Sequence, residues 1–204
     1  MEGNLAVGQK AWKHAVQCYR QALQLTRMDG NVVERMQVVN GLGMALMQGG
    51  HYQDAEMLYR TAGKSDPVMA GFQSTALANS MAEALLGQGK LREAEGYAVL
   101  AAQQHGEASE DRELTASSYL LTAQARPGNP RNGELFAKAV ELFRKVGNPE
   151  KTRKALLESA KFLGARGARK EAARQLAEAR ALSTSLHGEQ LAAMERELQK
   201  EGEP

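Results

Sequence analysis

A short pattern recurs five times along the chain, and it constrains the fold more than any other feature. An alanine is followed four positions later by an aromatic or aliphatic residue, and three positions after that by a small residue. Spacings of four and seven place these side chains on one face of a helix. The copies are separated by steps of 40, 39, 45 and 33 residues, and they begin at Ala15, Ala55, Ala94, Ala139 and Ala172. The chain has no isoleucine and is rich in Ala, Leu, Gln and Glu, so it favours helices over a sheet.

The clearest unit spans residues 36–67 and predicts a helix, a turn at Gly49-Gly50, a second helix and a closing Asp-Pro. This unit resembles the tetratricopeptide repeat, which pairs two antiparallel helices. Eight residues stand at the matching spacings: Val39, Leu42, Gly43, Leu46, Ala55, Tyr59, Ala62 and Pro67.

Repeat steps near 40 residues are longer than the usual 34 and are similar to those of kinesin light chains, Leu-Gly-Asn-repeat polarity adaptors, bacterial peptide-sensing regulators and soluble NSF-attachment proteins. The resemblance implies an all-α, right-handed α-solenoid of about five antiparallel helix pairs, closed by a C-terminal capping helix. We expect one repeat domain over residues 1–204. Its repeats would cover residues 1–29, 30–66, 67–107, 108–148 and 149–183, with the capping helix at 184–202.

Small residues and turn residues predict the local geometry. Gly43 and Ala55 are small where the two helices of a pair should cross closely. Gly49 and Gly50 should end the first helix with a left-handed or flexible turn. Only residues 1–9 remain for the opening helix of the first repeat, so we expect a stub there. The run RPGNPRNG at residues 126–133 should form an exposed loop of eight residues.

In the tetratricopeptide superfamily the first helix of each pair lines a concave groove that holds a peptide. Asn40 and Asn79 each lie fifteen residues before a second-helix alanine, so they are equivalent, and an amide suits binding of a peptide backbone. Side chains on the same stripe would make the groove apolar and amide-lined at one end and basic at the other. The candidate groove residues are Gln37, Asn40, Met44, Met47, Asn79, Glu83, Leu86, Arg112, Tyr119, Lys154 and Lys161.

The sequence shows no catalytic constellation. The four histidines lie far apart, so we expect no metal ion and no cofactor. Cys18 is the only cysteine, which excludes an internal disulfide and suits a reducing compartment. No apolar run is long enough to span a membrane and no secretory signal is visible, so we expect a cytoplasmic location.

These features predict a non-catalytic scaffold or adaptor whose groove binds a protein or peptide segment, apolar at first and then acidic. One alternative is a ligand-sensing regulatory module of a larger protein. Another is a binder of acidic surfaces through residues 131–180, which carry 13 basic and 6 acidic side chains. We do not expect nucleic acid as the main partner. A homodimer formed through the truncated first repeat is a further alternative.

Overall fold

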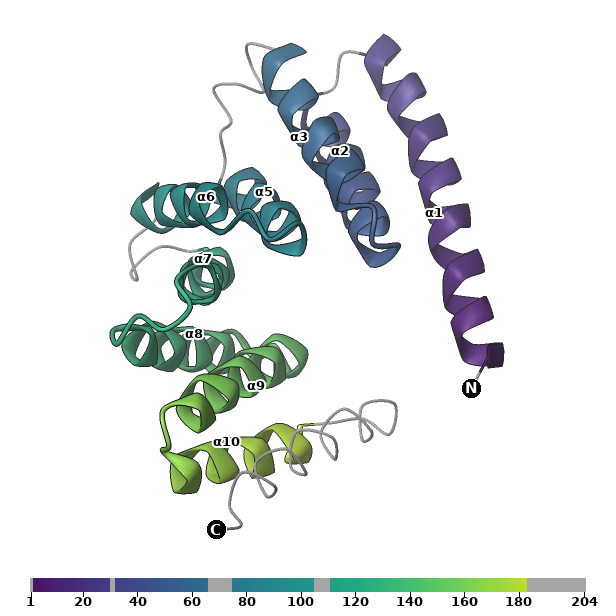
Figure 1. Cartoon of the computed structure of the whole chain (residues 1–204). Coiled ribbons are helices and arrows are strands. Elements are labelled where there is room, and N and C mark those ends of the chain that lie inside the picture. The colour runs from purple at the N-terminus through teal and green to yellow at the C-terminus, as the bar shows by residue number, and fades with distance from the viewer. Residues whose placement is uncertain (1, 30–31, 66–74, 105–110, 183–204) are drawn as a thin grey trace. The chain divides into compact units, whose positions relative to one another are not determined.

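A computed structural model describes residues 2–29, 32–65, 75–104 and 111–182, and these residues form nine α-helices and no strand (Figure 1). The all-α class predicted from the sequence is therefore confirmed. None of the described helices is both long and apolar enough to cross a bilayer. The helices are α1 (Glu2–Asp29), α2 (Val32–Gln48), α3 (Tyr52–Ser65), α5 (Thr75–Gly87), α6 (Leu91–Gln104), α7 (Arg112–Ala125), α8 (Asn132–Val146), α9 (Pro149–Ala165) and α10 (Arg169–Ala181).

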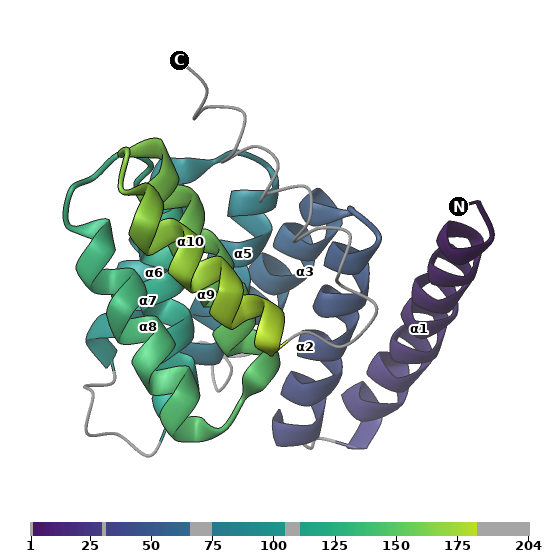
Figure 2. The same cartoon turned by 90° about the horizontal axis from the view of Figure 1, so that it is seen from below.

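The chain divides into two compact units, residues 1–104 and 105–204. In unit 1, the helix pairs α2/α3 and α5/α6 follow the single long helix α1. Helix α2 packs between α1 and α3, and α3 in turn packs against α5 (Figures 1 and 2). In unit 2, the pairs α7/α8 and α9/α10 pack in chain order, with α8 against α9. Within each unit the pairs therefore stack on their neighbours, as in an α-solenoid.

The close crossing of α2 and α3 depends on the glycine that the repeat pattern places there. Tyr59 on α3 is 1% exposed, and its ring lies directly against the backbone of Gly43, where a Cβ atom would overlap with it. Ala55, one turn earlier on α3, is also fully buried. The close approach of the helices predicted at Gly43 is therefore confirmed. The same aromatic-on-glycine contact recurs in unit 1, where Tyr52 lies against Gly87.

The turns within pairs are short because a glycine takes the left-handed conformation at the end of the first helix. Gly50 has a φ of 77°, and the amide of His51 reaches back to the carbonyl of Leu46 with a hydrogen bond of 2.9 Å. A side chain at this φ would strain the backbone. The predicted Gly-Gly turn is thus confirmed.

Unit 2 is held by an apolar core shared by its four described helices, α7 to α10. The two phenylalanines of α8, Phe136 and Phe143, are at most 4% exposed, and the core includes Leu120 of α7, Leu156 of α9 and Leu176 of α10. Alanines fill the contacts between these larger side chains. Because each helix contributes to one cluster, the four helices should unfold together.

Two local predictions were wrong. Residues 2–29 form one continuous helix, so the first repeat has no separate opening stub. The 126–133 run is not an eight-residue loop, because α8 begins at Asn132. Asn132 is 1% exposed, and its amide donates to the carbonyls of Ala123 (2.9 Å) and Arg126 (2.7 Å), which satisfies the end of α7. The predicted capping helix at 184–202 lies outside the described residues.

Candidate functional site

The first helices of the two pairs in unit 1, α2 and α5, lie side by side. The Ser80 hydroxyl on α5 donates to Oδ1 of Asn40 on α2 at 3.0 Å. One stripe of α2 next to this contact is open to solvent. Gln37 and Asn40 are exposed, Met44 keeps 48% of its surface exposed, and Met47 is half-buried. An exposed methionine beside two amides provides apolar surface together with hydrogen-bonding groups.

The corresponding stripe of α5 is less open. Glu83 and Leu86 are half-buried, whereas Asn79 is only 7% exposed. The two asparagines that are equivalent in the repeat pattern therefore differ in environment: Asn40 lies at the surface and Asn79 in the interior. We name the open surface formed by Gln37, Asn40, Met44, Met47, Glu83 and Leu86 the α2–α5 face.

In unit 2 the predicted groove residues are spread over α7 and α9. Arg112 is exposed, while Tyr119 is half-buried and lies 5.5 Å from the ammonium of Lys138 on α8 in a cation–π contact. Lys154 and Lys161 are exposed on α9, where Lys161 pairs with Glu158 at 2.8 Å. These residues therefore offer positive charge on α9, part of which is already compensated.

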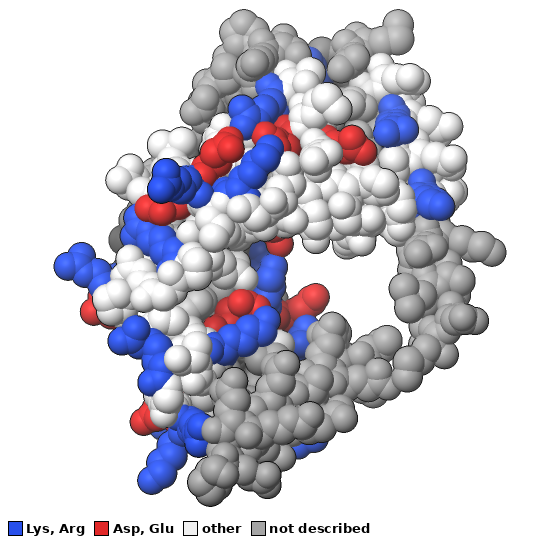
Figure 3. Space-filling view, in the orientation of Figure 1, with Lys and Arg blue, Asp and Glu red and all other residues white. Residues whose placement is uncertain are grey.

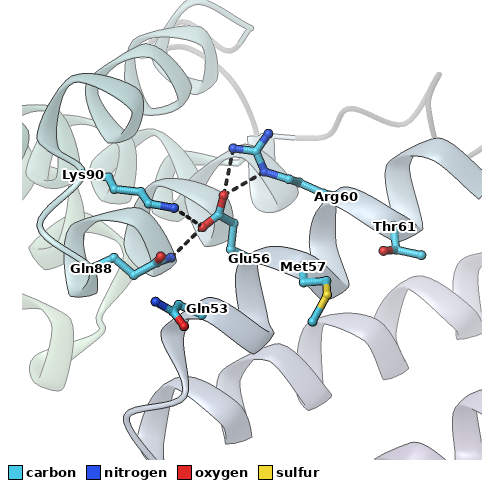
Figure 4. Close-up of a pocket in the computed structure, with 7 residues that line it drawn as sticks. All are labelled: Gln53, Glu56, Met57, Arg60, Thr61, Gln88 and Lys90. Atoms are coloured by element: carbon cyan, nitrogen blue, oxygen red, sulfur yellow. Dashed lines mark hydrogen bonds and ion pairs between the residues drawn. The ribbon is translucent and has the colours of Figure 1, made fainter.

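A charged cluster that the sequence analysis missed joins α3 to the turn between α5 and α6. The carboxylate of Glu56, a residue only 8% exposed, accepts hydrogen bonds of 2.8 Å from Arg60, Gln88 and Lys90 (Figure 4). The Lys90 ammonium and the Gln88 amide together outweigh burial and lower the pKa of Glu56 to about 2. Gln88 and Lys90 lie 32 and 34 positions from Glu56, so only a search offset by about one repeat could have found them. Arg60 lies four positions away and forms a local pair that the sequence analysis did not consider.

This cluster forms one wall of a pocket of about 480 Å³. Figure 4 shows Gln53, Met57 and Thr61 along α3, with Gln88 and Lys90 on the opposite side. Arg60 also bonds Glu93 of α6 at 3.1 Å, so both cations at the rim are paired with carboxylates. The pocket lies on second helix α3 and is separate from the α2–α5 face.

A second carboxylate joins successive pairs in unit 2. Glu113 on α7 pairs with the Lys151 ammonium at 2.7 Å and accepts a longer bond from Asn148, both at the start of α9. The Lys151 bond holds the pKa of Glu113 below its usual value. Asn148 also caps α9 by accepting from the Lys151 amide at 3.0 Å. In each unit a buried or half-buried carboxylate thus helps to join neighbouring pairs.

Lysine and arginine predominate on the visible face of α8, α9 and α10 in Figure 3. Several of these cations already have carboxylate partners. Arg144 pairs with Glu178, and Lys145 pairs with Glu141. Lys151 and Lys161 are also paired, so at least four of the thirteen basic side chains of residues 131–180 have a carboxylate partner.

The described residues contain no group of three or more His, Cys, Asp or Glu side chains that could hold a metal ion. Helix α1 nevertheless carries one His–Cys pair, which the spacing of the histidines alone does not reveal. His14 and Cys18 lie four residues apart on α1, and Nε2 of the imidazole is 3.7 Å from Sγ. Both side chains are exposed.

Comparison with known proteins gives similarity to nine chains of solved structures. Neither a protein-family model nor a curated protein matches the sequence. One of these structures contains nearly identical TPR-like repeats from a Podosopora anserina protein described as a kinesin light chain. The two are 18% identical and superpose with a TM-score of 0.48, over 88% of this chain and 94% of that one. This chain is thus similar to a TPR-like repeat protein.

Proposed function

We propose that this chain is a non-catalytic protein-interaction scaffold that holds a segment of a protein partner on the α2–α5 face. The observation that carries the proposal is the open stripe of α2. Met44 exposes 48% of its surface there, between the exposed amide of Asn40 and the half-buried Met47. The apolar surface of Met44 and Met47, next to hydrogen-bonding amides, suits contact with another chain.

The chemistry of the face suits an apolar segment that keeps its backbone accessible. Flexible thioethers adapt to side chains of different shape. Asn40 uses Oδ1 to accept from Ser80, and among the described residues its Nδ2 has no partner, so it can donate to a peptide carbonyl. We expect Glu83 to select against acidic residues at this point of the ligand.

Unit 2 offers Lys154 and Lys161 on α9, which we expect to attract acidic residues of a partner. Binding of an acidic surface through the wider basic block at 131–180 is the alternative. It would require Arg144, Lys145, Lys151 and Lys161 to leave the ion pairs that they form with carboxylates of this chain. A regulatory role within a larger protein would use the same face. A cytoplasmic location agrees with the single exposed cysteine.

The test is a random peptide library displayed on phage and selected on the full chain. Selected peptides would be synthesised with a fluorophore, and their affinity measured by fluorescence anisotropy. The matched variants are Met44→Asp and Met57→Asp. Met57 is 62% exposed on α3, so it controls for adding a charge at an exposed methionine outside the α2–α5 face.

We expect selected peptides to be rich in apolar residues and to lose at least about tenfold in affinity, or about 1.4 kcal/mol, with Met44→Asp. Met57→Asp should bind as the parent chain does. Circular dichroism should show that both variants keep their helices. Equal affinity of the Met44→Asp variant would refute the proposed face, and a loss confined to Met57→Asp would move the site to the Glu56 pocket.

A further inference from the structure

Helix α1 carries two metal-ligating side chains that the scaffold function does not use. His14 and Cys18 are separated by one helical turn and point the same way, with 3.7 Å between Nε2 and Sγ. Neither side chain contributes to the core, since both are exposed.

The distance between the two ligand atoms fits a tetrahedral zinc site. Zinc binds cysteine sulfur at about 2.3 Å and histidine nitrogen at about 2.0–2.1 Å. With these bond lengths and the tetrahedral angle of about 109°, sulfur and nitrogen lie about 3.6 Å apart. The 3.7 Å separation in α1 therefore needs almost no adjustment before a metal ion binds both atoms.

One such pair fills half of a tetrahedral site. Structural zinc sites take four protein ligands, and the described residues offer no third His, Cys, Asp or Glu near the pair. A second copy of this chain supplies the missing half with the same chemistry, because a two-fold axis through the metal brings the same two side chains to it again. The result is a closed Cys2His2 site.

The surface around the pair suits this arrangement. His14, Cys18, Gln21 and Leu25 follow one another at steps of four, three and four residues, so they form one stripe along α1. All four are exposed, and Leu25 keeps 65% of its surface exposed. When two copies meet along this stripe, the metal lies near one end and the two leucines add apolar contact two turns away.

We propose that His14 and Cys18 form half of a zinc site that joins two copies of this chain through α1. Coordination is through Nε2 and the thiolate Sγ, and the thiol proton is released to solvent as the metal binds. No electron is transferred. The metal would thereby create a symmetric scaffold that presents two α2–α5 faces.

The experiment is titration of the reduced, metal-free full chain with Co2+ as an optical substitute for zinc. We expect a thiolate-to-cobalt charge-transfer band and the intense visible bands of tetrahedral cobalt, saturating at about one ion per two chains. Zinc should displace the cobalt. Light scattering coupled to size exclusion should show a monomer without metal and a dimer with zinc.

Cys18→Ser should lose the charge-transfer band, and His14→Gln should lose the tetrahedral spectrum. Both variants should stay monomeric with zinc. Gln17→Ser, an exposed change on the same helix, should behave as the parent chain. Absence of the charge-transfer band in the parent chain would overturn the site. A saturated one-to-one complex that stays monomeric would overturn its completion by a second copy.

Discussion

The contact between Tyr59 and Gly43 can be tested by adding a single methyl group. In Gly43→Ala the new Cβ would overlap with the Tyr59 ring, which is 1% exposed and has little room to move. Overpacking of this kind costs about 1–3 kcal/mol of unfolding free energy. Alanine is also a better helix former than glycine by about 1 kcal/mol, so the net change combines two opposing effects.

Gly96 separates these effects. It lies inside α6, and a Cβ atom there would meet nothing within 4 Å. Gly96→Ala should therefore stabilise the chain by about 0.5–1 kcal/mol through helix propensity alone. Both variants gain the same helix propensity. The difference between their unfolding free energies therefore measures the overlap with Tyr59 alone. We expect this difference to be about 1–3 kcal/mol.

The measurement is urea unfolding followed by circular dichroism, with the slopes compared before the midpoints are converted to free energies. The double variant Gly43→Ala/Tyr59→Leu should recover part of the loss caused by overlap. If Gly43→Ala stabilises the chain as much as Gly96→Ala does, Tyr59 does not lie against α2. The explanation of the close crossing would then fail.

Three further outcomes follow. Because folding lowers the pKa of Glu56 to about 2 from a usual 4.5, its stabilising effect is complete above about 4.5 and is lost as the pH falls towards 2. Urea unfolding at several pH values should show this loss, and Glu56→Gln should reduce it. Asn132→Ala should cost about 2 kcal/mol in urea unfolding, because it removes two bonds to backbone carbonyls at the end of α7. Asn148→Ala should cost about 1 kcal/mol in the same assay through loss of the α9 cap, whereas exposed Lys170→Ala should change little.

Helix pairs were predictable because their determinants are local. The close crossing at Gly43 and the turn at Gly50 depend on residue size and on backbone conformation, both of which appear directly in the repeat pattern. The continuous helix α1 was missed because the repeat pattern assigned residues 1–9 to a separate opening helix. These residues instead lengthen the helix that contains Ala15. Asn132 was assigned to a loop from its neighbours, although its buried amide caps the preceding helix.

The candidate site was predictable only in part. Periodicity placed Asn40 and Met44 on one stripe of α2, and both are exposed. It could not show that Asn79, at the same repeat position, is 7% exposed, because burial depends on the neighbouring helices. Two of the three partners of Glu56 were hidden for the same reason: Gln88 and Lys90 lie about one repeat away, and pairing across repeats leaves no local pattern.

The most direct test of the proposed function follows the methionine methyl groups of the full chain by NMR, after ¹³C labelling, during titration with a library-selected peptide. Met44 and Met57 are both exposed and report on the α2–α5 face and on α3, respectively. We expect the Met44 signal to shift and saturate with the peptide while the Met57 signal stays in place. Saturable binding that leaves Met44 unchanged would contradict a partner segment held on the α2–α5 face.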